Sequence, residues 1–152
     1  MKIIITSIIF FILISNTGFA QIENPVQWAF SLKKISEKQY EVYVTATIEN
    51  KWHVYAQDAG EGPVPTSIIF SPNPLVILNG KVKEEGKLEK IFDPNFKSTL
   101  RYYADKVVFI QKIKLKSAAS TVLKGIVNYM VCNDKKCLPP KEIPFSLKVG
   151  GK

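Results

Sequence analysis

The feature that most constrains this chain is a two-residue alternation of apolar and polar side chains. The stretch from Tyr40 to Ile48 shows it most clearly, because every second residue is apolar or aromatic and the residues between them are mainly polar. Successive side chains of a β-strand point to opposite faces of a sheet, so this period predicts a half-buried strand. The period of 3.6 residues that marks an amphipathic helix is nearly absent. The sequence therefore predicts an all-β protein.

About nine short strands are expected, each bounded by turn or loop residues. They cover positions 26–32, 40–48, 52–56, 66–70, 75–78, 87–92, 107–115, 121–131 and 143–149. The Gly- and Pro-rich segment 58–65 predicts a loop, and Asn79-Gly80 predicts a tight turn. This number of short strands favours an immunoglobulin-like β-sandwich, with a closed barrel as the alternative.

The first twenty residues have the layout of a secretory signal peptide. Lys2 supplies a positive charge, an almost unbroken apolar run follows from Ile3 to Ile14, and small residues lead up to Ala20. We expect cleavage after Ala20 and a single domain over residues 21–152. An uncleaved N-terminal membrane anchor is the alternative. In either case we expect the domain to be exported to the periplasm.

The charge of the chain narrows the choice of partners. Removal of Lys2 with the signal lowers the formal net charge from +8 by one, to +7. The lysines are spread over predicted strands and turns, which fits solubility and protection of sheet edges. We therefore expect no nucleic acid partner and, by default, a monomer. An anionic membrane surface or an acidic protein is the alternative explanation for the charge.

Two cysteines, Cys132 and Cys137, stand in the loop between the last two predicted strands. Exported proteins mature in an oxidising compartment, and opposed strand ends bring Cβ atoms within reach of a disulfide. Such a bridge is either structural or redox-active. Closing a loop of about six residues stabilises a fold by roughly 2 kcal/mol, whereas an accessible disulfide is readily exchanged. A third interpretation is Cu(I) binding by both cysteines together with Met130 and His53, which are soft ligands.

Several motifs in the chain resemble one known family. They are Trp52-His-Val-Tyr55, Gly62-Pro-Val-Pro-Thr66, Asp93-x-x-Phe96 with Tyr102-Tyr103, and Gly125-x-x-x-Tyr129-x-x-Cys132-x₄-Cys137-x-Pro139-Pro140. From about Asn24 to Val149, the chain resembles the N-terminal periplasmic domain of DsbD-type thiol:disulfide interchange proteins. The resemblance implies an immunoglobulin-like fold whose cysteine pair carries electrons. No bound cofactor or metal is then required, because the disulfide is itself the redox group.

The resemblance also implies a set of partners. In that family the domain accepts reducing equivalents, through a thioredoxin-like domain, from a membrane-embedded electron relay. It passes them to periplasmic disulfide isomerases and to cytochrome c maturation proteins. We expect this chain to act as a stand-alone component of such a protein-disulfide reductase.

Site residues follow from the same resemblance. Cys132 and Cys137 would be the redox pair. The spacing does not distinguish the two sulfurs, and our own choice for the bond to the partner is Cys137. Phe96, in the loop that begins at Asp93, would be an aromatic cap that shields the disulfide from adventitious exchange. The residues expected to pack around the cap or the cysteine loop are Tyr102, Tyr103, Tyr129, Pro139 and Pro140. A movable aromatic lid would gate the exchange sterically, because a thiolate must reach a sulfur to react.

Overall fold

The computed structural model describes residues 23–94 and 96–151, and all regular structure in that part of the chain is β. It contains eleven strands, two more than expected. In chain order they are β1 (Val26–Lys34), β2 (Gln39–Ile48), β3 (Trp52–Tyr55), β4 (Ser67–Phe70), β5 (Val76–Gly86), β6 (Glu89–Asp93), β7 (Ser98–Tyr103), β8 (Lys106–Leu115), β9 (Thr121–Tyr129), β10 (Val131–Asn133) and β11 (Lys141–Val149). The predicted signal peptide at positions 1–20 lies outside the described residues.

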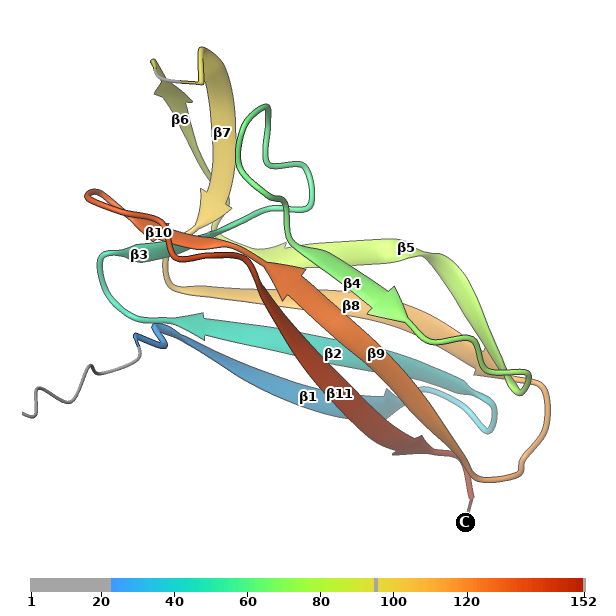
Figure 1. Cartoon of the computed structure of the whole chain (residues 1–152). Coiled ribbons are helices and arrows are strands. Elements are labelled where there is room, and N and C mark those ends of the chain that lie inside the picture. The colour runs from blue at the N-terminus through green and yellow to red at the C-terminus, as the bar shows by residue number, and fades with distance from the viewer. Residues whose placement is uncertain (1–22, 95, 152) are drawn as a thin grey trace, which may run out of the picture.

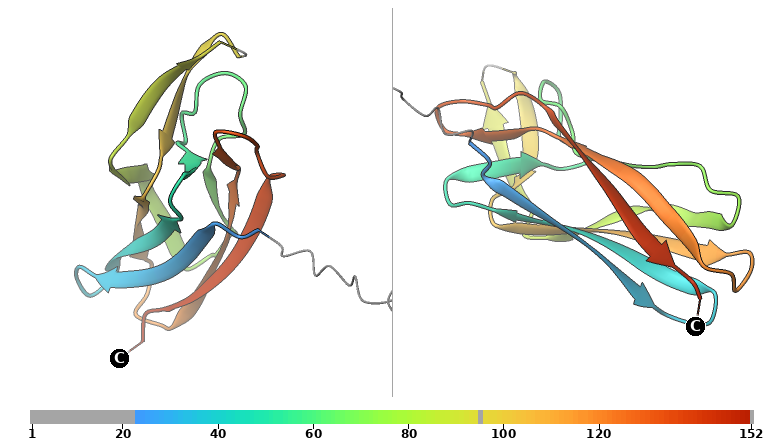
Figure 2. Two further views of the ribbon diagram at one scale, coloured as in Figure 1. Left: turned by 90° about the vertical axis from the view of Figure 1, so that its left-hand side faces the viewer. Right: turned by 60° about the horizontal axis from the view of Figure 1, so that its bottom comes forward.

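The strands form three antiparallel sheets (Figure 1). A four-stranded sheet with the order β1-β2-β8-β5 faces a three-stranded sheet with the order β11-β9-β4, and the two make a sandwich. The third sheet, β10-β3-β7-β6, lies at one end, and its β6–β7 hairpin projects beyond the sandwich (Figures 1 and 2). The prediction of an all-β sandwich is confirmed.

The core lies between the two facing sheets and follows the alternation in the sequence. On β2 the predicted inward set, every second residue from Tyr40 to Ile48, is buried throughout. Phe109 of β8 and Val127 of β9 are fully buried in the same cluster. Burying an apolar side chain of this size stabilises a fold by roughly 1.5–3 kcal/mol. The core therefore contributes much more free energy of folding than the roughly 2 kcal/mol that closing a short disulfide loop could add.

Both additional strands belong to the third sheet. The sequence predicts no strand at 98–103, where the structure has β7, and predicts a single strand over positions 121–131. In the structure β9 pairs with β11 as far as Tyr129, and after Met130 the chain moves over to pair Val131–Asn133 with β3. This crossing carries Cys132 out of the sandwich and into the third sheet.

The prediction of a turn at Asn79-Gly80 is wrong. β5 continues through these residues to Gly86, with a register shift against β8 between Asn79 and Lys83. Gly80 adopts a φ of 74°, the left-handed conformation that glycine tolerates. The residues that favour a turn here form a bulge instead, and the strand bends without ending.

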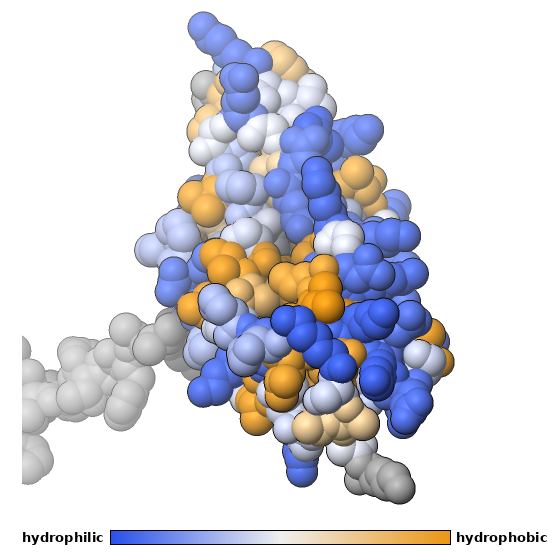
Figure 3. Space-filling view, turned by 90° about the vertical axis from the view of Figure 1, so that its right-hand side faces the viewer, coloured by the Kyte–Doolittle hydropathy of each residue, from blue (hydrophilic) through white to orange (hydrophobic). Residues whose placement is uncertain are grey.

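The end of the sandwich opposite the cysteine loop is partly apolar. Apolar side chains gather there among hydrophilic ones (Figure 3). The β4–β5 connection at this end has a pocket lined by Phe70, Val76 and Leu78, among others. No helix that is long and apolar enough to cross a membrane occurs in residues 23–94 or 96–151.

Candidate functional site

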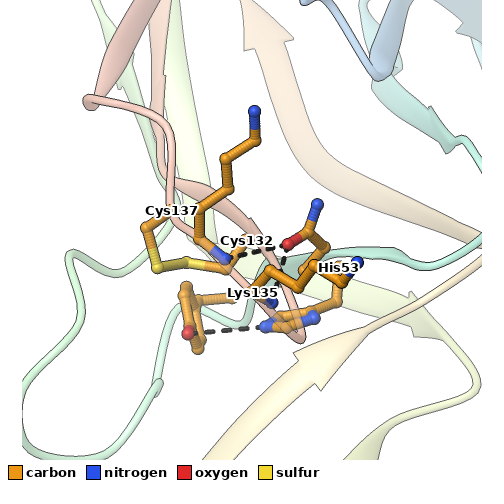
Figure 4. The surroundings of a disulfide bond; sticks show 7 residues. His53, Cys132, Lys135 and Cys137 are labelled. Atoms are coloured by element: carbon orange, nitrogen blue, oxygen red, sulfur yellow. Dashed lines mark hydrogen bonds between the residues drawn. A yellow bond between two sulfur atoms is a disulfide. The ribbon is translucent and has the colours of Figure 1, made fainter.

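Cys132 and Cys137 form a disulfide, as the sequence predicts (Figure 4). They face each other across a small hairpin of their own, beyond the end of the β9–β11 pairing, with their Cα atoms 4.0 Å apart. The main-chain N–H of Asn133 donates to the carbonyl of Lys136, and that of Leu138 donates to the carbonyl of Val131, both at 2.9 Å. The cysteines are thus a directly opposed pair between two main-chain hydrogen bonds, the arrangement that brings side chains closest.

The side chain of Asn133 closes the turn of this hairpin. Its Oδ1 accepts hydrogen bonds from the main-chain N–H groups of Lys135 and Lys136, both at 2.9 Å. Asparagine favours turns because its side chain can satisfy nearby main-chain donors in this way. The Nζ of Lys136 is 2.6 Å from a carboxylate oxygen of Glu23, so this lysine is held toward the N-terminal segment. The cysteine loop is therefore anchored on both sides of its tip.

The two cysteines differ in their exposure to solvent. Cys132 is only 2% exposed, because β10 packs on β3 and places this residue in a small apolar cluster with Tyr55, Ala59 and Leu100. Cys137 lies on the outer arm of the hairpin and is exposed. A thiol exchanges only with a sulfur that it can reach. The geometry therefore offers Cys137 to an incoming thiol and keeps Cys132 inside.

A pocket of about 240 Å³ is lined by both cysteines and by side chains from β3, β6 and β7. Its other residues are mainly aromatic or apolar, with two carboxylates: His53, Tyr55, Ile91, Phe96, Leu100, Tyr102, Asn133, Asp93 and Asp134. Burial, followed by the charge of Asp93, raises the pKa of Tyr55. Burial and the nearby Glu89 raise the pKa of Tyr102. Both phenols are thus protonated donors at neutral pH.

The predicted cap lies at the tip of the β6–β7 hairpin and lines the same pocket. A carboxylate oxygen of Asp93 accepts a hydrogen bond from the main-chain N–H of Phe96 at 3.3 Å. The Phe96 side chain is 45% exposed. Its ring occupies the space that a Cβ atom on Gly62 would fill, so it rests on the Gly- and Pro-rich loop. This loop rises beside the hairpin (Figure 1), and the N–H of Glu61 donates to Oγ of Ser98 at 3.0 Å.

The structure separates the remaining predicted site residues into two groups. Tyr102 lines the disulfide pocket, whereas Tyr103 points to the other face of β7 and is buried in the main core. Tyr129 is also buried in the main core, with its ring 5.1 Å from that of Trp28. Pro139 and Pro140 are exposed and lead from the cysteine hairpin into β11.

Tyr55, Ile91 and Leu100 line the pocket of the disulfide, although no sequence signal linked them to the cysteines. His53, a candidate Cu(I) ligand in the sequence, pairs with Cys132 across β3 and β10. The described part of the chain holds no group of three or more His, Cys, Asp or Glu side chains arranged to bind a metal ion.

The fold and the site together define an immunoglobulin-like domain that carries a disulfide beside an aromatic pocket. Residues 21–148 match the family described as "Thiol:disulfide interchange protein DsbD, N-terminal". The chain belongs to this family, which transfers reducing equivalents by thiol–disulfide exchange. The resemblance predicted from its motifs is confirmed.

Solved structures of low sequence identity share the fold. The N-terminal periplasmic domain of ScsB from Proteus mirabilis is 17% identical, with a TM-score of 0.59 over 88% of this chain and 50% of that chain. The DsbD N-terminal domain of Neisseria meningitidis in its reduced form is 18% identical, with a TM-score of 0.52 over 82% of this chain and 86% of that chain. The chain thus spans about half the length of the ScsB structure.

A third structure contains a complex between the DsbD N-terminal and PilB N-terminal domains of Neisseria meningitidis. It is 15% identical, with a TM-score of 0.52 over 84% of this chain and 87% of that chain. No curated protein sequence matches the chain significantly.

Proposed function

We propose that this chain is an exported domain that shuttles electrons between proteins through the Cys132–Cys137 disulfide. The observation that carries the proposal is the asymmetry of the pair, with Cys137 exposed and Cys132 buried beside an aromatic pocket. A disulfide of this kind admits a partner at one sulfur and keeps the other for the internal reaction. Membership of the DsbD N-terminal family supports the same function.

The exchange proceeds in two halves. A donor thiolate attacks Sγ of Cys137, a bond forms between donor and Cys137, and the Cys132–Cys137 bond breaks with its electron pair left on Cys132. A second donor thiolate then attacks the donor sulfur of the mixed disulfide and releases Cys137, so the donor is oxidised and the domain is reduced. In the second half, the Cys137 thiolate attacks a disulfide of the acceptor. Cys132 then attacks Cys137 and releases the reduced acceptor.

The proposed donor is a thioredoxin-like protein fed by a membrane electron relay. The proposed acceptors are periplasmic disulfide isomerases or thiol proteins of cytochrome c maturation. Support comes from family membership, from the signal-like segment at positions 1–20, and from the neighbouring structure in which a DsbD N-terminal domain is in complex with another protein domain. We further propose that residues 21–152 act as one periplasmic, monomeric domain, with Phe96 and Tyr102 shielding the disulfide.

A second candidate function is a binding module whose disulfide is only structural. It is favoured by the large core, which holds the sandwich without help from the cysteines. The weakness of the bridge as a staple argues the other way, because closing so short a loop stabilises a fold by only about 2 kcal/mol.

The reduction potential of the purified domain separates the two functions. Equilibration in glutathione or dithiothreitol buffers should give a potential in the range of working exchangers, roughly −180 to −270 mV. A potential below about −300 mV would identify a structural bridge and would support the binding module. A Cys132→Ser/Cys137→Ser double variant is the control. It should lose all electron transfer to a thioredoxin-like partner while remaining folded, whereas a binding module would keep its partner.

A further inference from the structure

The residue directly opposite the buried cysteine is the single histidine of the chain. His53 of β3 and Cys132 of β10 are partners in the antiparallel register. Directly opposed residues in such a pair point to the same face, with Cβ atoms about 4.5–5.5 Å apart. Both residues also line the same pocket. Figure 4 shows His53 beside the Cys132 end of the disulfide.

The imidazole is held between two tyrosine rings. Its centroid is 4.4 Å from that of Tyr102 and 5.3 Å from that of Tyr55, which it meets edge-on. A long hydrogen bond of 3.4 Å joins Nε2 of His53 and the hydroxyl oxygen of Tyr55. These contacts fix the ring in place beside Cys132.

The groups that face His53 come from four elements. Tyr55 lies on its own strand and Tyr102 on β7. Glu89 and Asp93 belong to β6, and Asp134 belongs to the cysteine loop. Burial lowers the pKa of His53, while the charges of Asp134 and Glu89 oppose that shift. With the disulfide closed, the imidazole is accordingly neutral at neutral pH, and no proton is stored beside the sulfur.

We propose that His53 is the acid–base partner of Cys132, taking the proton from its thiol when the pair closes and returning it when the pair opens. In the closing step the proton moves from Sγ of Cys132 to an imidazole nitrogen. The resulting thiolate attacks Sγ of Cys137, the internal disulfide forms, and the bond from Cys137 to the acceptor breaks with its electron pair on the acceptor sulfur. The imidazolium then releases this proton to solvent. In the opening step the imidazole takes up a proton from solvent, the imidazolium stabilises the departing Cys132 thiolate, and the proton passes to Sγ of Cys132. This inference rests on the proposed exchange function.

The physical reason is the cost of a buried thiolate. Burial in an apolar cluster disfavours the charged form of a thiol, and a nearby imidazolium favours it. Cys132 must nevertheless become a thiolate in each half of the cycle. A neutral aromatic residue at position 53 would fill the same space between the tyrosines but could not compensate that charge.

The first experiment needs no variant and no partner protein. The ring protons of the single histidine are titrated by NMR in the oxidised and in the reduced domain. If His53 and Cys132 are coupled, the ring protons should show in the reduced domain a second titration step at the pH where the Cys132 thiol ionises, which the oxidised domain lacks. An identical titration in both redox states would overturn the proposal.

The second experiment reads Cys132 directly. In a Cys137→Ser background Cys132 is the only thiol, and its ionisation is followed by thiolate absorbance. Adding His53→Phe, which keeps an aromatic ring, should raise the pKa of Cys132 by about one unit, and His53→Gln should do the same. Trp52→Phe, on the same strand but the opposite face, is the matched control and should leave that pKa unchanged. Equal values with and without His53 would overturn the proposal.

The result of these titrations does not depend on whether the proposed shuttle function is correct. If the titrations show coupling but the wild-type domain exchanges no electrons with a thioredoxin-like partner, the shuttle is disproved and the coupling of His53 to Cys132 stands. If the exchange occurs but His53 and Cys132 titrate independently, the shuttle stands and His53 is only a packing residue.

Discussion

The burial of Cys132 and the exposure of Cys137 assign them different roles, although the sequence presents them as a symmetric pair. An attacking thiolate reaches Cys137 because Cys132 is covered by β3 and the loop that follows it. We expect Cys132→Ser to accumulate a mixed disulfide through Cys137 when mixed with a thioredoxin-like protein that lacks its own resolving cysteine and whose remaining cysteine carries thionitrobenzoate as the leaving group. Cys137→Ser should accumulate several-fold less. Non-reducing electrophoresis with mass spectrometry measures both, and equal trapping would show that burial does not decide which sulfur reacts.

Gly62 determines where the ring of Phe96 can lie. A Cβ atom at this position would overlap that ring, and the φ of 120° is itself unfavourable for other residues. Gly62→Ala should therefore displace the ring and speed reduction of the disulfide by glutathione several-fold. Gly80→Ala is the matched control, since Gly80 has a positive φ but no atom within 4 Å of its Cβ position. Equal rates in the wild type and in Gly62→Ala would argue that Phe96 does not shield the disulfide.

Sequence motifs were sufficient to predict which residues form the disulfide and that Phe96 and Tyr102 line its pocket. They could not assign the neighbouring Tyr103, because only a defined strand shows that adjacent side chains point to opposite faces. The position of His53 beside Cys132 could not be predicted for a different reason. Its pairing with Cys132 joins strands almost eighty positions apart, and no local pattern encodes such a register.

At the scale of elements, β5 shows where local signals mislead. Asn-Gly is a strong turn signal, yet here it forms a bulge because β8 continues alongside and supplies partners. Buried Gln111 of β8 donates from Nε2 to the carbonyls of Asn79 and Gly80, at 3.2 and 3.3 Å. The strands whose alternation faces the main core were predictable, whereas β7 and β10 were not, because their pairing depends on the third sheet.

The bulge gives a prediction for stability. Gln111→Ala removes hydrogen bonds to the bulge and empties a buried site, so it should lower the free energy of unfolding by about 1–2 kcal/mol. Urea denaturation measures the change. Gln27→Ala is the matched control, because Gln27 is exposed on β1, and it should change stability by less than about 0.5 kcal/mol. A Gln111→Ala variant as stable as the wild type would mean that the bulge needs no side-chain support.

At the scale of the whole molecule, Glu84 joins the sandwich to the sheet that carries the site. Its carboxylate lies on β5 and accepts hydrogen bonds from the main-chain N–H of Gln57 at 2.6 Å and from the Tyr103 hydroxyl at 3.3 Å. Gln57 directly follows the buried segment after β3, and Tyr103 ends β7. The position of the disulfide pocket on the sandwich therefore depends partly on this carboxylate.

This junction makes stability depend on pH at the alkaline end. Burial, and then the charge of Glu84, raise the pKa of Tyr103 to about 12, against 10.0 for an unperturbed tyrosine. Between these values the unfolded chain has lost the phenolic proton and the folded chain retains it. The stabilisation is therefore complete below pH 10 and is lost as the pH rises toward 12. Other tyrosines titrate in the same range, so the quantity to measure is the difference between wild type and Tyr103→Phe in urea denaturation at each pH. That difference should shift in favour of the variant from pH 10 to pH 12. Glu84→Gln keeps a hydrogen-bond acceptor but removes the charge, so the loss of stabilisation should be complete at a lower pH. A difference between wild type and Tyr103→Phe that stays constant with pH would show that Tyr103 does not report on the junction.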